Sequence, residues 1–483
     1  MGWSNGYVAD VPYTSGYYRD MAPAHQALAA LVAGVAPPDP SRPFRYLELG
    51  CGTGVSLATL AAANPQAKFV GVDFMPSHVA AARRLIAAAG LANIEVFEGS
   101  FEALAEGDGL GQFEFAAVHG VYTWVSPAAQ QAIVRILNGA LAPGGLVYFG
   151  YNNMAGFQDM IAGQKLLIEQ ARRHVGDSTS RMRAALELML ELHRAGARTF
   201  DTSMLPKELQ GEGADPGKLP LAMLVYLAHE YLNEHWRPLF ITDVARDLAE
   251  AKLEFVGRSH LLEVLPPLVL NDRQREVVAD TADPVLLELQ TDIIAPVAFR
   301  RDLFVRGGLR LSASRQAELM NAVQIVLAVT PEEFPMTLTV LNGKLDLDAK
   351  VYGPIIARIA GGPASVAELI ELAKGVGARV SALEIIAVLV GCGAAAPVVR
   401  TDPDVGAIRR FNAAVVESYR EQAALRFTLA SGVTGAGFDA PLPQCLAYLL
   451  ASGQAQSLAG FDLKPLEEIA SGRQDFWRRL GMM

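Results

Sequence analysis

Short apolar segments alternate with helix-like segments over the first third of the chain. The apolar segments, which are typical of strands, cover residues 46–49, 68–73, 94–98, 113–119 and 143–150. An alanine-rich helical stretch separates the first two. Strands that alternate with helices are typical of a parallel, doubly wound sheet. We therefore predict an α/β domain over residues 1–155.

Helical periodicity replaces this alternation after the fifth strand. It covers residues 156–198, and an amphipathic helix over 242–251 and a strand over 253–257 follow later. A closing helix and a short strand are a common end for such a sheet. We therefore predict that residues 156–235 are a helical insertion between the fifth strand and the end of the same sheet. The alternative is a separate middle domain within residues 156–305.

The last region, residues 306–483, contains no nucleotide-binding motif. Residues 355–373, 381–390 and 394–399 show the succession of helices and a short strand that is typical of a winged helix. We expect a C-terminal winged-helix-like and helical domain. Protein recognition or dimerisation is the preferred role, a purely architectural role is the alternative, and DNA reading does not fit an acidic chain.

Charge and composition narrow the class of protein. The formal net charge of −10 over 483 residues argues against broad nucleic-acid binding, which uses basic surfaces. We interpret Arg172 with Arg173, and Arg300 with Arg301, as solvated helix faces. Three scattered cysteines are too few for a disulfide framework or a metal cage. Neither a secretion signal nor a membrane span is visible, so we expect a cytoplasmic protein.

A glycine-rich loop carries the first chemical signal. Residues 46–54, Tyr-Leu-Glu-Leu-Gly-Cys-Gly-Thr-Gly, lead from a strand into a helix. Gly50, Gly52 and Gly54 allow a sharp turn and the close approach of a ligand, whose anionic group would face the helix N-terminus. Asp73 ends the second strand, where a carboxylate can accept both hydroxyls of a ribose. The spacing differs from the Gly-x-Gly-x-x-Gly of dinucleotide sites, so we predict another adenosine compound.

Tyrosines cluster near the N-terminus, on a segment without helical or strand periodicity. They are Tyr7, Tyr13, Tyr17 and Tyr18. We interpret the segment as a flap that closes over the ligand and offers aromatic faces and hydroxyls to a cationic substrate. Packing against the domain edge is the alternative.

A possible metal motif lies at residues 226–236, where His229-Glu230 precedes His235. Zinc-binding helices need their histidines four residues apart, on one face. Here the histidines are six residues apart. We therefore predict no metal site, and expect structural hydrogen bonds or an interaction patch.

Several motifs together resemble a known family. They are residues 12–18 (Pro-Tyr-Thr-Ser-Gly-Tyr-Tyr), 46–54, 71–74 (Gly-Val-Asp-Phe), 118–126 (Val-His-Gly-Val-Tyr-Thr-Trp-Val-Ser), 226–233 (Tyr-Leu-Ala-His-Glu-Tyr-Leu-Asn) and 300–306 (Arg-Arg-Asp-Leu-Phe-Val-Arg). The combination resembles the class I S-adenosylmethionine-dependent methyltransferases with a methyltransferase regulatory domain. Within that group it is similar to the lysine methyltransferases of bacterial outer-membrane proteins. The resemblance implies a Rossmann-like sheet, S-adenosylmethionine as cofactor, and a protein substrate, such as an outer-membrane or surface protein before export. A homodimer is compatible with it.

The resemblance also implies roles for single residues. Glu48 and the glycine loop surround the methionine end of the cofactor, and Phe74 flanks the adenine. Ser100 departs from the aspartate that many relatives use to bind the adenine amine. His119 faces the transferred methyl and departs from the Asn/Asp-Pro-Pro-Tyr motif of nucleic-acid amino methyltransferases. The expected cofactor contacts are Tyr13, Glu48, Gly50, Cys51, Gly52, Gly54, Asp73, Phe74, Ser100, Phe101 and His119.

A lysine acceptor sets demands on the site. Its amine has a pKa of about 10.4, so its deprotonation at pH 7 costs about 4 to 5 kcal/mol. We expect His119 or a flap tyrosine such as Tyr18 to hold or relay the proton. Tyr122 and Trp124 either shape an aromatic channel or pack under their loop. The alternative functions are a small-molecule N- or O-methyltransferase and a non-catalytic S-adenosylmethionine-binding regulator.

Overall fold

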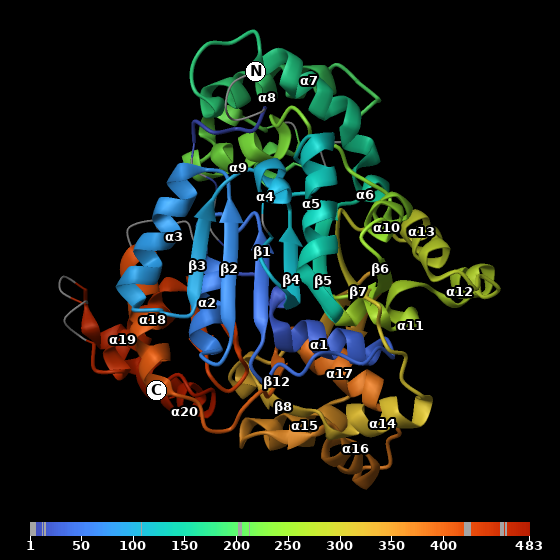
Figure 1. Cartoon of the computed structure of the whole chain (residues 1–483), viewed down its shortest axis with the longest axis vertical. Coiled ribbons are helices and arrows are strands. Elements are labelled where there is room, and N and C mark those ends of the chain that lie inside the picture. The colour runs from blue at the N-terminus through green and yellow to red at the C-terminus, as the bar shows by residue number, and fades with distance from the viewer. Residues whose placement is uncertain are drawn as a thin grey trace.

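A computed structural model describes residues 6–11, 13, 16–107, 109–200, 205–211, 213–419, 427–454, 458 and 461–483. Pro12, Thr14 and Ser15 of the N-terminal motif lie outside these residues. A central sheet divides the described chain into a cap of helices at the carboxyl ends of the strands and a C-terminal region near their amino ends (Figure 1).

Seven strands form the central sheet in the order β3-β2-β1-β4-β5-β7-β6. They are β1 (Arg45–Leu49), β2 (Lys68–Asp73), β3 (Ile94–Glu98), β4 (Phe113–His119), β5 (Leu141–Asn152), β6 (Leu253–Arg258) and β7 (Phe299–Arg306). The first five strands are parallel, and β7 is antiparallel to both β5 and β6. The predicted α/β doubly wound sheet is confirmed, including the strand at residues 253–257. Strand β7 was not predicted from the sequence.

Helices cover both faces of the sheet. The N-terminal part contributes η1 (Arg19–Met21), α1 (Pro23–Val32), α2 (Val55–Ala63), α3 (Pro76–Ala89), α4 (Phe101–Glu106) and α5 (Pro127–Ala140). Residues of α1, α2 and α3 share a core with one face, and those of α5 and of α10 (Ile241–Ala249) share a core with the other. Because β1 lies between β2 and β4, the order of strands reverses there, which leaves a crevice at their carboxyl ends.

Helix α2 is buried along its whole length. The sheet covers one side, and β13 (Phe427–Ser431) and β14 (Ala436–Ala440) lie against the helix from the C-terminal region. A helix with an apolar stripe on one side would leave polar groups against one of these neighbours. The alanine-rich sequence that follows the glycine loop therefore fits a helix covered on both sides.

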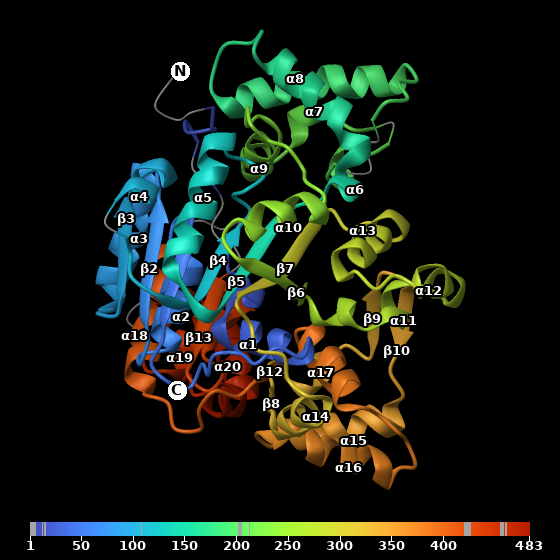
Figure 2. The same ribbon diagram turned by 45° about the vertical axis from the view of Figure 1, so that its right-hand side comes forward.

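The cap is formed by the chain between β5 and β6. It comprises α6 (Met154–Phe157), η2 (Gln158–Met160), α7 (Ile161–Ala171), α8 (Ser178–Arg194), η4 (Lys207–Leu209), η5 (Pro216–Lys218) and α9 (Leu221–Tyr231). Helices α7, α8 and α9 lie beyond the carboxyl ends of the strands (Figures 1 and 2). The chain then returns through α10 into β6 of the same sheet, as the insertion hypothesis expects.

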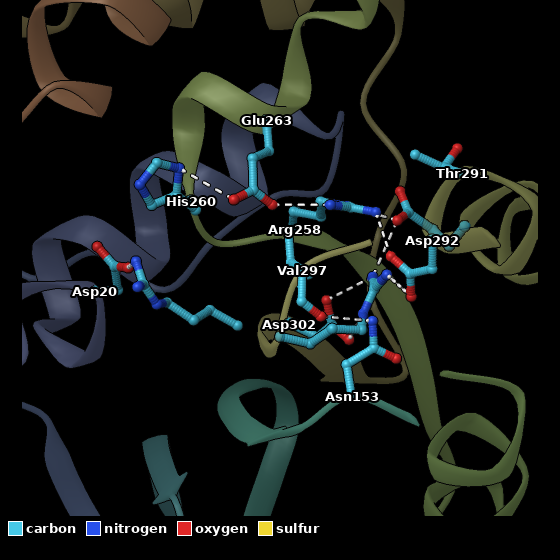
Figure 3. A network of polar contacts seen from close by, with 12 residues as sticks. Asp20, Asn153, Arg258, His260, Glu263, Thr291, Asp292, Val297 and Asp302 are labelled. Atoms are coloured by element: carbon cyan, nitrogen blue, oxygen red, sulfur yellow. Dashed lines mark hydrogen bonds and ion pairs between the residues drawn. The ribbon is translucent and has the colours of Figure 1, made fainter. Parts of the chain in front are cut away.

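An arm of short helices connects β6 to β7. It comprises η6 (Leu261–Val264), α11 (Pro266–Val269), α12 (Asp272–Val278) and α13 (Pro284–Ile294), and α12 projects from the body (Figure 2). A buried ionic network fixes the arm to the sheet (Figure 3). Arg300 donates to Asp292 Oδ2 at 2.8 Å and to Asp302 Oδ2 at 2.8 Å, and Arg258 donates to Asp292 Oδ1 at 2.9 Å.

This network corrects the interpretation of the pair Arg300 and Arg301. Both residues lie on strand β7, and the Arg300 side chain is only 1% exposed. Each guanidinium nitrogen of Arg300 has a carboxylate partner, which is the condition under which a buried charge is tolerated. Arg300 is therefore part of the interior, and Arg301, whose side chain is 39% exposed, lines the cavity described below. Arg172, next to the C-terminus of α7, is exposed.

The C-terminal region begins with α14 (Ala313–Ala322) and two small sheets. Its elements are β8 (Gln324–Leu327), η7 (Pro331–Glu333), β9 (Thr337–Val340), β10 (Gly343–Asp346), α15 (Ala349–Ala360), β11 (Ala364–Ser365), α16 (Val366–Gly375), α17 (Ala382–Gly391) and β12 (Ala395–Pro397). The three helices α15 to α17 stand where the sequence predicts them. The small sheet beside them has the order β11-β8-β12, and its central strand β8 comes before these helices in the chain. The sequence pattern predicted only a strand after the helices, and the winged-helix assignment stays a prediction.

The last elements are α18 (Val405–Tyr419), β13, β14, α19 (Leu442–Ala451) and α20 (Leu463–Arg479). They pack against α2 and α3, and a continuous hydrophobic core joins them to the sheet. Tyr17 belongs to this contact, since its hydroxyl accepts a hydrogen bond of 2.8 Å from the Gly437 N–H. Within the described parts of the chain, none of the helices combines the length and the apolar character that crossing a membrane requires.

Candidate active site

A cavity of about 420 Å³ lies at the crevice where the strand order reverses. The glycine loop after β1 and the ends of β2 and β4 form one side. The N-terminal segment, α9 and the start of β7 form the other. Residues predicted from the sequence that line it are Tyr7, Tyr13, Tyr18, Glu48, Gly50, Cys51, Gly52, Asp73, Phe74, Phe101, His119 and Trp124.

The glycine loop takes a conformation that other residues rarely adopt. Gly50, Gly52 and Gly54 have φ angles of 77°, 53° and 72°. A Cβ on Gly50 would lie 2.4 Å from Val121 Cγ2, and one on Gly54 would lie 2.7 Å from Ala82 Cβ. Gly52 faces open space beside the cavity. Gly54 does not line the cavity and instead begins α2, so it shapes the loop from behind.

Asp73 ties the loop to the end of β2. Its Oδ2 accepts a hydrogen bond of 2.8 Å from the Gly52 N–H, and its Oδ1 accepts one of 2.9 Å from the Met75 N–H. His78 Nδ1 lies 3.2 Å from the same Oδ1. The carboxylate is therefore fixed at the rim of the cavity, where its remaining lone pairs can accept hydroxyl groups.

Glu48 is a buried carboxyl group on β1. Its side chain lines the cavity, and its Oε2 has no hydrogen-bond partner among the described residues. Burial, with a contribution from the charge of Asp73, raises the pKa of Glu48 to about 8. A buried oxygen that lacks a partner is costly, so this position suits a ligand that brings a cationic N–H donor.

The opposite end of the loop is apolar. Phe74 and Phe101 line it, and both follow directly on strand ends or exit loops as the sequence predicts. Ser100 does not line the cavity. Its Oγ instead accepts a hydrogen bond of 3.2 Å from the Ala103 N–H, and so caps α4. The two phenylalanine side chains give this part of the cavity an apolar wall.

His119 lies at the end of β4 within an aromatic stack. The Tyr18 ring lies 3.7 Å from it between centroids, and Nδ1 is 2.9 Å from the Tyr148 hydroxyl. A Cβ on Gly150 would lie 2.8 Å from His119 Nδ1, so the glycine makes room for the imidazole. Burial, together with the charge of Arg301, lowers the pKa of His119 to about 3. The ring is therefore neutral at pH 7 and is a poor acceptor of a proton.

Comparisons with known proteins agree with this geometry. A methyltransferase domain profile matches residues 47–145, and a predicted methyltransferase regulatory domain matches residues 224–306. An uncharacterized protein, sll1526 of Synechocystis, is 33% identical over 401 residues, which cover 83% of this chain and 78% of the relative. A second uncharacterized relative, RP789 of Rickettsia prowazekii, is 26% identical over 332 residues, which cover 67% of this chain and 57% of the relative.

The chain belongs to the S-adenosylmethionine-dependent methyltransferases that carry a methyltransferase regulatory domain. The structure of PKMT2 from Rickettsia typhi, solved in complex with AdoHcy, shares the fold over 97% of this chain and 99% of its own, with a TM-score of 0.66 and 16% identity. The matched regulatory domain extends from α9 through the arm to β7. It therefore includes both the end of the sheet and one wall of the cavity.

The N-terminal segment of the methyltransferase covers the cavity. Tyr7 packs edge-on against Phe74 with 5.4 Å between centroids, and Tyr13 packs edge-on against Trp124 with 5.9 Å. Hydrogen bonds hold the segment to the cap, for example from the Ser178 N–H to Asp10 at 2.7 Å. Three of the four predicted flap tyrosines thus line the cavity, and Tyr17 does not, because it packs against the C-terminal region.

Tyr122 and Trp124 lie on opposite sides of their loop. Trp124 lines the cavity, and its Nε1 donates a hydrogen bond of 2.7 Å to Asn152 Oδ1. The Tyr122 ring is buried behind the sheet, and its hydroxyl donates to Asp247 Oδ2 at 3.1 Å. Trp124 therefore lies where an aromatic channel is expected, whereas Tyr122 packs under the loop, which is the alternative for these residues.

Several residues of the cavity were not predicted from the sequence. Tyr226 and Glu230 of α9 line it, as do Phe299 and Arg301 of β7. Arg301 Nη1 lies 3.2 Å from Asp20 Oδ2. The spacing of Tyr226 and Glu230 by one helical turn was visible in the sequence. The sequence did not indicate that this turn of α9 would face the cavity.

Among the described residues, no group of three or more histidine, cysteine or carboxylate side chains is placed to hold a metal ion. His229 is buried, and its Nε2 lies 3.1 Å from the Val11 carbonyl oxygen. Asn233 donates to the His229 carbonyl and accepts a hydrogen bond of 3.0 Å from the Val8 N–H. The histidine therefore makes structural hydrogen bonds that attach the N-terminal segment to the cap.

Proposed function

We propose that this methyltransferase modifies the side-chain amine of lysine residues in a protein substrate. The observation that carries the proposal is the wall opposite the sheet, where tyrosines gather around one carboxyl group, that of Glu230. They are Tyr7, Tyr13, Tyr18 and Tyr226. Aromatic faces and a carboxylate attract a cationic group, and a protonated lysine is such a group.

In this proposal S-adenosylmethionine lies along the sheet side of the cavity. Glu48 receives the ammonium group of its methionine part, which supplies the partner that Oε2 lacks. The Asp73 carboxylate accepts hydrogen bonds from the ribose hydroxyls, and Phe74 and Phe101 enclose the adenine. When bound, the cofactor supplies an electrophilic methyl group on a sulfonium sulfur.

The remaining residues orient the acceptor. Methyl transfer is an in-line displacement, so the amine lone pair must point at the methyl while water is kept away. The His119 and Tyr18 rings, which contact each other at a tilt of 34°, form an apolar surface at the end of β4, where the two sides of the cavity meet. Because burial lowers the pKa of His119 to about 3, its imidazole is too weak a base to take the proton of the lysine at pH 7, and another group must take it.

The acceptor end of the cavity is open enough for a side chain of another protein. Tyr18 is 39% exposed and Tyr226 is 41% exposed, so solvent reaches the tyrosine-lined wall. The cap beside it provides a surface larger than a small metabolite needs. The sequence resemblance to lysine methyltransferases of outer-membrane proteins supports the same acceptor, met in the cytoplasm before export.

The test is to incubate the full chain with methyl-labelled S-adenosylmethionine and fractions of a bacterial lysate. Label is expected in protein, and acid hydrolysis of that protein should release methylated lysine. The Asp73→Ala variant is the control for transfer that does not depend on the cofactor site. Label found only in small molecules, or in an amino acid other than lysine, would contradict the proposal.

A further inference from the structure

Glu230 is an acidic residue on the inner side of α9. It lines the cavity, and Tyr226, one helical turn earlier, donates a hydrogen bond to its carboxyl group. The carboxyl group also interacts electrostatically with Tyr18, which in turn interacts with Glu48 of the cofactor side. Glu230 therefore lines the wall opposite the sheet side proposed for the cofactor, and Tyr18 interacts electrostatically with groups of both sides.

The groups around Glu230 come from three elements. They are Tyr7, Tyr13 and Tyr18 of the N-terminal segment, Tyr226 and Tyr231 of α9, and Glu48, Asp73, His119 and Arg301 of the sheet, of which Arg301 lies at the start of β7 on the same side as α9. Arg301 forms an ion pair with Asp20. Burial raises the pKa of Glu230 to about 7. A carboxyl group in this state can exist with or without its proton near neutral pH.

We propose that Glu230 binds the ammonium group of the acceptor lysine and takes one of its protons before methyl transfer. This rests on the proposed function. The N–H bond breaks and the proton moves to a Glu230 oxygen, which leaves a neutral amine with a lone pair. That pair forms the new N–C bond while the electrons of the S–C bond stay on sulfur. The products are a methylated lysine ammonium and S-adenosylhomocysteine, and Glu230 returns its proton to water.

Glu230 suits this step better than the residues predicted from the sequence. His119 holds a proton only in strongly acidic solution, and burial raises the pKa of the Tyr18 hydroxyl above its ordinary value. Neither group accepts a proton readily at pH 7. A carboxylate poised near neutrality accepts one and also attracts the ammonium before the transfer.

The experiment compares the full-length wild-type chain with Glu230→Gln, Glu230→Asp and a matched control, Glu187→Gln. Glu187 is an exposed residue of the neighbouring α8, so its substitution removes the same charge outside the cavity. Calorimetry with S-adenosylhomocysteine checks folding and the cofactor site, and affinities should stay within about threefold of wild type. Methyl transfer to poly-L-lysine is then followed from pH 6 to pH 10.

The glutamine variant should lose about 100-fold in kcat/KM at pH 7, as expected for removal of a general base. The wild-type rate should fall as the pH drops through about 7, because the carboxylate is the active form. The loss in Glu230→Gln should shrink toward pH 10, where free lysine loses its proton unaided. Glu230→Asp should retain the pH dependence with a reduced rate, and Glu187→Gln should match wild type.

Two failures are distinguishable. If the wild-type chain forms no methyl-lysine, the proposed function fails and Glu230 has no acceptor to deprotonate. If the wild-type chain forms methyl-lysine and Glu230→Gln does so equally fast at pH 7, the proposed function stands and the role of Glu230 is wrong. A loss that is the same at every pH also overturns the proton-transfer role, because a merely structural defect does not depend on the charge of the acceptor.

Discussion

The two sides of the cavity are held together by different forces. On the cofactor side, backbone geometry dominates, since left-handed glycines and N–H groups that donate to Asp73 fix the loop against β2. On the acceptor side, side-chain contacts dominate, because Tyr7, Tyr13 and Tyr18 contact other rings edge-on or at a tilt. A single substitution on the cofactor side should therefore cause a large loss of cofactor affinity. A substitution on the acceptor side should instead change the selectivity or the rate of methyl transfer.

The largest effect is expected for Gly50→Ala. The new Cβ would lie 2.4 Å from Val121 Cγ2, and alanine also disfavours the φ of 77°. Strain and rearrangement of the loop should weaken S-adenosylhomocysteine binding on the order of 100-fold by calorimetry. Gly99→Ala is the matched control, because a Cβ there meets nothing within 4 Å. Equal affinity of the two variants would show that the loop geometry does not control binding.

Binding should also depend on pH through Glu48. Because the ligand ammonium favours the carboxylate, and the pKa of the empty site is about 8, binding must release a proton below that pH. Affinity should therefore rise by about tenfold per pH unit from pH 6 to pH 7 and level off above 8. Calorimetry in buffers of different ionisation enthalpy measures the released proton. Glu48→Gln should bind weakly and lose the pH dependence, and a wild-type affinity independent of pH would contradict the pairing.

Asp73→Ala should weaken S-adenosylhomocysteine binding by about tenfold or more, because the ribose hydroxyls lose a charged acceptor. The loop also loses the hydrogen bond from the Gly52 N–H. Glu98→Gln is the control, since Glu98 pairs with Asp73 in the register of β2 and β3 and is exposed. A similar loss in both variants would indicate a general effect of charge at this edge.

The same difference explains what the sequence predicts and what it does not. A strand end, a glycine turn and a helix start are neighbours in the chain, so the order of residues alone places Glu48, Gly50 and Asp73 together. Ser100 caps α4 and does not line the cavity, because its hydroxyl suits a helix cap as well as a ligand contact.

The acceptor side depends on contacts between distant segments. The partners of Arg300 lie on α13 and β7, so its charge looked like that of a surface residue until these elements were paired. Glu230 looked like part of a failed metal motif, because the N-terminal tyrosines that enclose it lie more than 200 residues away. Patterns of period two and 3.6 predict the elements, and they do not specify which distant side chains will share a cavity.

Tyr18→Ala tests whether the acceptor side can be changed without changing cofactor binding. Removing the ring exposes His119 without touching the glycine loop, so S-adenosylhomocysteine affinity should stay within about threefold while methyl transfer falls by about tenfold, the scale of one aromatic contact. Tyr18→Phe retains the ring contact with His119 and should keep most of the rate. Initial rates of methyl transfer to a protein acceptor compare the two variants with wild type. A large loss of cofactor affinity in Tyr18→Ala would mean that the two sides are not separable.

The smallest effect on function is expected for Tyr122→Phe, in the same loop as the cavity residue Trp124. The substitution removes only the hydrogen bond to Asp247, and the ring stays packed 5.0 Å from Phe149 between centroids. The free energy of unfolding in urea should fall by about 1 kcal/mol, the net value of one such hydrogen bond. Cofactor affinity and methyl transfer should match wild type. Trp124→Phe is the contrasting variant, because it removes the hydrogen bond to Asn152 at the cavity wall and should slow transfer. If Tyr122→Phe slows transfer as much as Trp124→Phe, the loop acts as one unit and the assignment of its two sides is wrong.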